Sequence, residues 1–320
     1  MKKFLAGTFS VVAITLAFVI PFSQRQQFND WYVLQSYKPS AQVSSLASAT
    51  AMTDYGRKLF YVNDPELIAD KSSFTAKCNQ MEESIVLGCY ISNNGIFLYQ
   101  VKDQRLNGVV EVTAAHEMLH VGYERLNNSE KNRINALLLA EYKNIKDKRL
   151  IDTIKAYEAK DPAVVLNELH SILPTEVTKL SGELEDYYKK YFTDRSLVTA
   201  LSSKYENEFI TREQKIEAYD TELTQKKQQI DSNLAQIERL SDALNIEKSR
   251  MDNYRQLGDI TSYNNSVGPY NQLVNQYNSL VRSTQSQIDS YNVLVENRNT
   301  LAGDIKSLVD SIDSRPQLQN

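Results

Sequence analysis

The chain has 320 residues, a formal net charge of −4, 42% hydrophobic residues and 24% charged residues. A chain of this length can bury one or two substantial cores, and its 10 glycines and 7 prolines are too few for a collagen-like or proline-rich disordered protein. The slightly acidic, mixed charge disfavours a nucleic-acid-binding protein, so we expect no nucleic-acid partner. The 2 cysteines exclude a disulfide-dense scaffold and a four-cysteine metal site.

The N-terminus carries a long apolar run. Lys2 and Lys3 precede residues 4–22, which contain no charged side chain. Such a run is about long enough to cross a bilayer as a helix, and both cleaved signal peptides and uncleaved anchors have this pattern. Because no small-x-small cleavage pattern ends the run, we expect residues 1–23 to be a signal anchor. This transmembrane helix would leave the rest of the chain outside the cytoplasm. Secretion after signal-peptide cleavage is the alternative.

Residues 24–200 mix strand-like and helix-like patterns, which predicts an α+β domain. Residues 56–62 alternate enough to be a strand, and the β-rich runs 85–91 and 96–101 flank an Asn-Gly turn, which is a strong hairpin signal. Helical patterns then follow over residues 109–123, 129–145, 149–159 and 162–173, and a fifth helix begins after residue 181. Ser129 is the expected N-cap of the second of these helices.

The two cysteines, Cys78 and Cys89, bracket a short loop of this domain. They are too sparse for a metal site and have no histidine neighbour. If the domain lies outside the cytoplasm, we expect them to form a disulfide. Two unpaired buried thiols are the alternative.

Residues 201–314 carry a heptad pattern. Apolar residues recur at a strict seven-residue step in the first half, at Ile216, Leu223, Ile230, Ile237, Leu244 and Met251. A second run continues from Tyr270 to Ile312, and the Gly- and Asn-rich residues 258–269 between the runs are typical of a turn. The pattern predicts an antiparallel coiled-coil hairpin, followed by a tail at 315–320. The hairpin is expected to act as a spacer, a self-association surface or an arm that binds a protein partner.

The chemistry of the chain is concentrated in the motif His116-Glu117-x-x-His120, which lies in a helical pattern. On a helix, the two histidines are one turn apart on the same face, so both imidazoles can bind one Zn²⁺ ion. Glu117 is rotated away from them and can act as a general base on a metal-bound water. The apolar neighbours of the motif place this helix in a core, where polar side chains need partners.

At these residues the chain resembles the zincin metallopeptidases. The resemblance covers about residues 50–200 and implies a mixed sheet, a motif helix, and later helices that supply a third zinc ligand. It also implies that the strand at 96–101 lines the cleft and binds substrate backbone by strand addition. The metzincin continuation is absent, because Val121, Gly122 and Tyr123 follow His120.

The third ligand has three candidates. The gluzincin branch of the family takes a glutamate from a later helix, and Asn167, Glu168 and Ser171 match that setting. His170 is an alternative ligand, but it is two residues from Glu168 on a helix, so the two should not both bind the metal. Glu176 is the other alternative, either as a ligand or as a hydrogen-bond partner of a ligand histidine. We expect the polar residues that follow to be packing or surface residues: Tyr187, Tyr188, Tyr191 and Arg195.

These expectations combine into one function. The sequence predicts a membrane-anchored zinc metallopeptidase that hydrolyses peptide bonds outside the cytoplasm, with Glu117 as the base. The alternative is a cell-envelope scaffold or adhesion protein, in which the coiled coil binds partners and the metal site is structural. Glu117 favours the enzyme, because a structural site does not need a carboxylate at that position.

Overall fold

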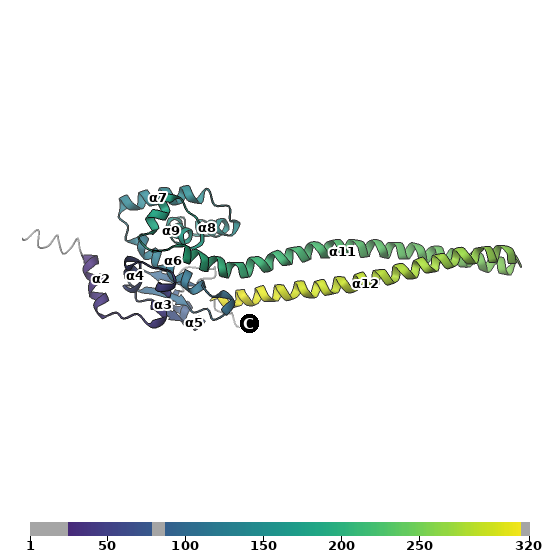
Figure 1. Cartoon of the computed structure of the whole chain (residues 1–320), viewed down its shortest axis with the longest axis horizontal. Helices are drawn as coiled ribbons and strands as arrows, with labels where there is room; N and C mark the ends of the chain where they lie inside the picture. The colour runs from purple at the N-terminus through teal and green to yellow at the C-terminus, as the bar shows by residue number, and fades with distance from the viewer. Residues whose placement is uncertain (1–24, 79–86, 315–320) are drawn as a thin grey trace, which may run out of the picture. The chain divides into compact units, whose positions relative to one another are not determined.

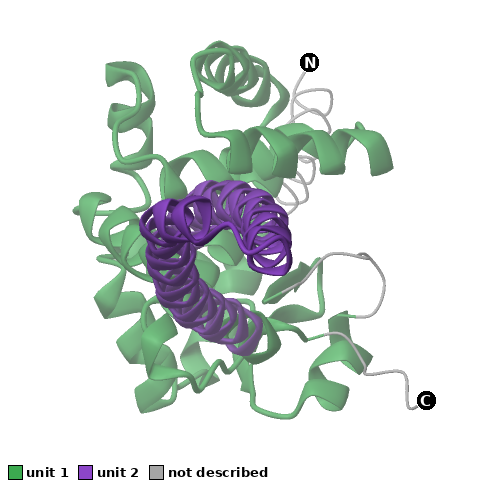
Figure 2. Ribbon diagram, turned by 90° about the vertical axis from the view of Figure 1, so that its right-hand side faces the viewer, with its two compact units in different colours: residues 1–208, 308–320 green, residues 209–307 purple. Residues whose placement is uncertain are grey.

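The computed structural model describes residues 25–78 and 87–314 (Figure 1). The segment 1–23, for which the sequence predicts a transmembrane anchor, and the tail 315–320 lie outside the described residues. Within the described ranges, no helix combines the length and the apolar character needed to cross a membrane. The chain divides into two compact units, formed by residues 1–208 with 308–320 and by residues 209–307 (Figure 2).

The expected α+β fold class is wrong. Most of the described residues are helical, and the described strands are three short segments: β1 (Glu66–Ile68), β2 (Gly88–Ile91) and β3 (Gly95–Tyr99). They form a sheet in the order β1-β3-β2. The first unit is therefore a helical protein with a small sheet.

One predicted strand is in fact a helix. Residues 56–62 fall mainly in α4 (Asp54–Tyr61), which buries Gly56, Leu59 and Phe60. That spacing of three and four residues places them on one face of a helix. Thr53 caps the helix, because its side chain accepts a hydrogen bond from the Gly56 backbone N–H at 3.0 Å.

The predicted hairpin is present, but its second strand has no free edge. β2 pairs antiparallel with β3, and the turn between them uses positive φ values at Asn93 (61°) and Gly95 (134°). β3 also pairs with β1, in parallel. Because β3 has a neighbour on both sides, the expectation that this strand binds substrate backbone is wrong. In the described sheet β2 is an edge strand instead.

Helices surround this sheet and build the core. The helix α6 (Val109–Glu124) buries most of its circumference and packs against α9 (Val165–Glu176). Among its described residues the first unit also contains α2 (Arg25–Ser36), α3 (Ala41–Ala49), α5 (Lys71–Cys78), η1 (Gln104–Leu106), α7 (Asn128–Tyr142), α8 (Lys148–Lys160) and α10 (Gly182–Tyr188). The N-cap of α7 is Asn127 rather than the expected Ser129, and it forms a capping box with Glu130.

The sequence predicted that this helix ends before Pro174. Instead, α9 continues through the proline to Glu176. A proline within a helix leaves the carbonyl of the residue four positions earlier without its usual N–H donor. Here that carbonyl belongs to His170, and the hydroxyl of Tyr188 donates to it at 2.9 Å. The tyrosine replaces the missing helical hydrogen bond, so the helix tolerates the proline.

The second unit is a helical hairpin. α11 (Ser196–Gln256) and α12 (Ile260–Ile312) supply its two arms. Arg298 Nε donates to Asp220 at 3.0 Å and Asn233 donates to Gln287 at 2.9 Å, so the arms run antiparallel. The turn is much shorter than the expected 258–269, since only residues 257–259 separate the helices, with Gly258 at a φ of 72°.

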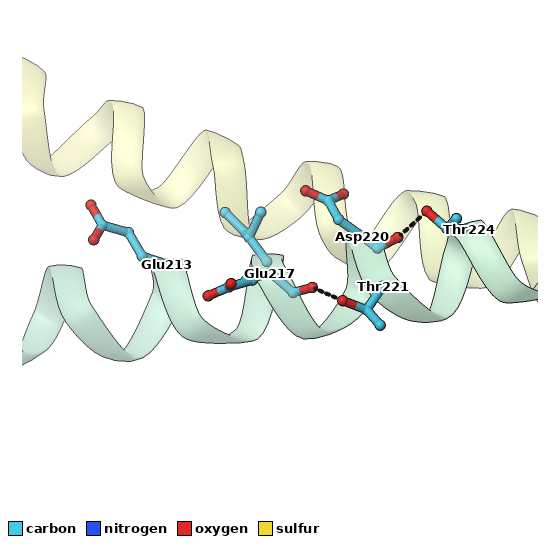
Figure 3. Close-up of a pocket in the computed structure, with 6 residues that line it drawn as sticks. Glu213, Glu217, Asp220, Thr221 and Thr224 are labelled. Atoms are coloured by element: carbon cyan, nitrogen blue, oxygen red, sulfur yellow. Dashed lines mark hydrogen bonds between the residues drawn. The ribbon is translucent and has the colours of Figure 1, made fainter.

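A hollow on this hairpin is lined by one face of α11 (Figure 3): Glu213, Ile216, Glu217, Asp220, Thr221 and Thr224. The hydroxyl groups of Thr221 and Thr224 donate to the backbone carbonyls of Glu217 and Asp220, at 3.0 and 2.8 Å. The hollow offers carboxylates but no imidazole, and we assign no binding site to it.

Both ends of the hairpin belong to the first unit. Val198, near the start of α11, and Leu308, near the end of α12, are fully buried. The backbone carbonyls of Asp310 and Ser314 accept hydrogen bonds from Lys71 at 3.0 Å and from Thr75 at 2.8 Å. The last described residues therefore close the first unit against α5.

Candidate metal centre

The motif helix α6 presents two imidazoles to one point. The ring centroids of His116 and His120 are 4.7 Å apart, as expected for residues one helical turn apart. Their side chains retain 19% and 11% of their exposure. The histidines are thus shielded by the core but not sealed within it.

The helix α9 brings Glu168 to the same point. Its Oε2 atom lies 3.6 Å from His116 Nε2, and its Oε1 atom lies 3.7 Å from His120 Nε2. One possible ligand atom from each of the three residues lies within 4.8 Å of the others. These distances are too long for hydrogen bonds. They suit three groups that surround a common ion.

The carboxylate of Glu168 shows that the residues fit a metal. Its Oε2 atom is buried and has no hydrogen-bond partner, although a buried carboxylate needs a cation or a donor. Two imidazoles and one carboxylate are also a ligand set that Zn²⁺ uses in catalytic sites. His116, His120 and Glu168 are therefore the residues that would hold the ion.

The electrostatics of the cluster indicate what a cation would replace. Burial lowers the pKa of His116, but the neighbouring carboxylates of Glu168 and Glu117 outweigh it and raise that pKa to about 9. Burial also lowers the pKa of His120, which stays below its usual range. His116 therefore holds a proton beside Glu168. A metal that binds here must displace this proton, so its uptake releases protons.

A second contact orients His120. The hydroxyl of Ser171 on α9 lies 3.3 Å from the Nδ1 atom of His120, and both residues are buried. A partner on Nδ1 fixes the ring, so that Nε2 faces the metal position. The sequence contained a signal for this role, since Ser171 is three residues after Glu168 and so lies near it on the helix.

Glu117 lies against the edge strand of the sheet. A Cβ atom on Gly88, the first residue of β2, would lie only 2.9 Å from Glu117 Oε1 and 3.0 Å from its Cγ. Glu117 is 4% exposed. Gly88 therefore allows the backbone of β2 to approach the carboxylate. This glycine lies outside the sequence motif, and the one signal for it was its place within a predicted strand, where a glycine often marks such a close approach.

His170 lies in a separate cluster and is not placed with the metal-binding groups. It is fully buried, and its Nε2 atom contacts the Tyr187 hydroxyl at 2.8 Å. Burial lowers its pKa to about 3, which keeps the imidazole neutral. Four tyrosine rings lie within 6 Å of its own, centroid to centroid: Tyr123, Tyr187, Tyr188 and Tyr191.

Glu176 is also engaged elsewhere. Its carboxylate forms an ion pair with Arg149 Nη2 at 2.7 Å, and the same nitrogen binds Glu206 at 2.7 Å. Arg195, at 7% exposure, donates to the carbonyls of Pro174 and Val177 at 3.0 and 2.6 Å. It fixes the C-terminal end of α9 rather than facing the cluster. Of the three candidate ligands, the structure brings only Glu168 to the histidines.

The two cysteines are joined in a disulfide. It links the last residue of α5 to β2, the strand that contacts Glu117.

Comparisons with known proteins add no family assignment, because no family model, curated protein or solved structure matches the chain.

Proposed function

We propose that this chain is a zinc-dependent peptidase. One observation carries the proposal: the buried carboxylate of Glu168, without a hydrogen-bond partner on Oε2, lies 3.6 Å and 3.7 Å from the two motif imidazoles. The resemblance of the motif to zincin metallopeptidases supplies the substrate class.

The residues of the site have separate tasks. His116, His120 and Glu168 would hold the ion, and Ser171 orients His120. Zinc, when bound, lowers the pKa of a water molecule and polarises a carbonyl group. Glu117 is the general base: its carboxylate takes a proton from the attacking water and passes it to the departing amine.

The strand β2 supports a peptide as the substrate. It is an edge strand of the described sheet, and its first residue, Gly88, lies against Glu117. An extended peptide can bind to such an edge through backbone hydrogen bonds. A peptide on β2 would run past the catalytic carboxylate.

The disulfide between Cys78 and Cys89 supports an oxidising compartment, since such bonds are rare in the cytosol. We therefore propose that the enzyme acts outside the cytoplasm. The helical hairpin, built from helices of 61 and 53 residues, favours a second candidate, a scaffold protein with a structural zinc site.

The test is zinc content and peptide hydrolysis of the full chain and three variants. We expect about one zinc per chain in the parent and in Glu117→Gln, because Glu117 is not a ligand. Hydrolysis of a peptide mixture should fall by about 100-fold or more in Glu117→Gln, because the general base is lost. Glu168→Gln should lose most of the zinc, because a neutral amide is a weaker ligand.

Glu111→Gln is the matched control, because it makes the same change on the same helix away from the cluster. It should keep both zinc and activity. A parent that binds no zinc would overturn the proposal, as would full hydrolysis in Glu117→Gln. A parent that binds zinc but hydrolyses no peptide would favour the scaffold.

A further inference from the structure

The helix α12 carries a second apolar line beside the one that faces α11. Its members follow a strict seven-residue step: Val267, Val274, Val281, Ile288, Val295 and Ala302. Each directly follows a residue of the hairpin seam, by which we mean the heptad positions of α12 that face α11: Ser266, Leu273, Leu280, Gln287, Leu294 and Leu301. We call this set the α12 stripe. A helix that packs against a single partner needs only two apolar positions per heptad. A third position predicts that another helix covers it.

The stripe is only partly covered: Val281 is exposed, and the other members are half-buried, namely Val267, Val274, Ile288, Val295 and Ala302. The Asn233–Gln287 hydrogen bond fixes the register of the two arms. Reversing one helix of a pair brings equivalent heptad positions to the same side of the seam. The residues of α11 that flank the stripe are therefore mostly polar: Asp220, Lys227, Leu234, Ser241 and Lys248. Leu234 and Val281 remain 47% and 37% exposed.

The charges of α12 are unusually few and lie in one line. Between residues 260 and 297 the charged side chains are Arg282, Asp289 and Glu296, again seven residues apart. Each directly follows a member of the stripe. Neutral amides lie between the stripe and these charges, at Asn271, Asn278, Gln285 and Asn292. Two copies of this face can approach with little charge repulsion.

We propose that the α12 stripe packs antiparallel against the same stripe of a second copy of this chain, around a two-fold axis at Ile288. A two-fold interface is self-complementary. The axis brings Val281 opposite Val295 of the second copy and Val274 opposite Ala302, so each of these apolar residues meets another, while Val267 has no counterpart in the stripe.

The charges select this arrangement. The same two-fold axis places Arg282 on the same side of the interface as Glu296 of the second copy, two residues along the helix from it, and this neighbouring pair occurs twice. A parallel arrangement would instead bring each charge opposite its own counterpart and cost stability. The seven-residue step of the stripe also requires a partner that is itself a long helix with heptads. The chain provides such a helix in α12.

The first test is the mass of the full chain in mild detergent, measured by sedimentation equilibrium. The parent should be a dimer. Val281→Lys should weaken dimerisation by about tenfold or more, because it buries a charge in the interface. Val293→Lys is the matched control, since Val293 is more exposed, at 57%, but lies off the stripe. It should leave the dimer intact.

The second test exchanges the charges. Arg282→Glu and Glu296→Arg should each weaken the dimer, and the double variant should restore it. Asp289→Asn should strengthen the dimer, because Asp289 lies beside its own counterpart at the axis.

A monomeric parent would overturn the proposal. Equal effects of Val281→Lys and Val293→Lys would also overturn it, because they would indicate unspecific association. Failure of the double charge variant to recover would exclude the antiparallel register. None of these readouts depends on zinc or hydrolysis, so this proposal and the proposed function stand or fall separately.

Discussion

His120 is contacted on both sides of its imidazole ring. Its Nε2 atom lies 3.7 Å from Glu168 Oε1 and its Nδ1 atom lies 3.3 Å from the hydroxyl of Ser171. The two partners are on the same helix, three residues apart. The position of α9 therefore sets both the ligand and the group that orients its neighbour.

We expect Ser171→Ala to weaken zinc binding by about 10-fold to 100-fold, because the ring of His120 loses the contact that orients it. The measurement is a competition titration against a zinc chelator. Ser202→Ala is the control, since Ser202 is equally buried and its hydroxyl binds Glu206 rather than a histidine. Unchanged zinc affinity in Ser171→Ala would contradict the orienting role.

The residues of the motif were the most predictable part of the site. The spacing of His116 and His120 places both rings on one helical face whatever the rest of the chain does. Glu168 came from a local pattern that a family resemblance made visible. The tyrosines around His170 were not predictable, because they come from other helices and their contact depends on how α9 and α10 pack.

At the scale of elements, Arg149 connects three helices. It lies on α8 and binds Glu176 at the end of α9 and Glu206 on α11. Burial raises the pKa of Glu206, and the charge of Glu176 adds to this rise, so that the pKa reaches about 7 despite Arg149.

This raised pKa predicts a pH-dependent stability. The folded state holds the proton of Glu206 at pH values where the unfolded chain has released it, so stability should fall as the pH rises from about 4.5 to 7. Glu206→Gln removes the titrating group and should flatten this part of the curve. Urea unfolding of both proteins across this range is the measurement. Parallel curves for the two would show that Glu206 does not contribute.

The sequence predicted helices better than strands. The helices from α6 to α10 follow clear apolar spacing, and α7 and α8 also have side-chain caps. One end was predicted wrongly, because α9 continues through Pro174. Residues 56–62 alternate like a strand, but Thr53 caps a helix here, and Leu59 and Phe60 follow the buried Gly56 at helical spacings of three and four residues. The prediction of an α+β class was wrong partly because it counted this helix as a strand. The sheet is limited to three short strands, and β1, three residues long, is too short to show a period.

At the scale of the whole molecule, the disulfide closes a loop with a sequence separation of 11. It attaches α5 to β2 and so restrains the strand that contacts Glu117.

Replacing both cysteines, in Cys78→Ser with Cys89→Ser, should lower the free energy of unfolding by about 2–3 kcal/mol, because the unfolded chain regains the freedom of the loop. Urea unfolding measures the change. A reducing agent should produce a similar loss in the parent and none in the double variant. Equal stability of the parent with and without reductant would contradict this prediction.

Residues 209–307 form a unit of their own, while buried residues on either side of them, Val198 and Leu308, belong to the first unit. The chain thus leaves the first unit to form the hairpin and then returns to it, and both ends of the hairpin are held by buried residues. Excising equal numbers of whole heptads from α11 and α12 would keep the phase of the seam and leave both anchors untouched. The arms can therefore be made shorter or longer without changing the residues of the metal centre.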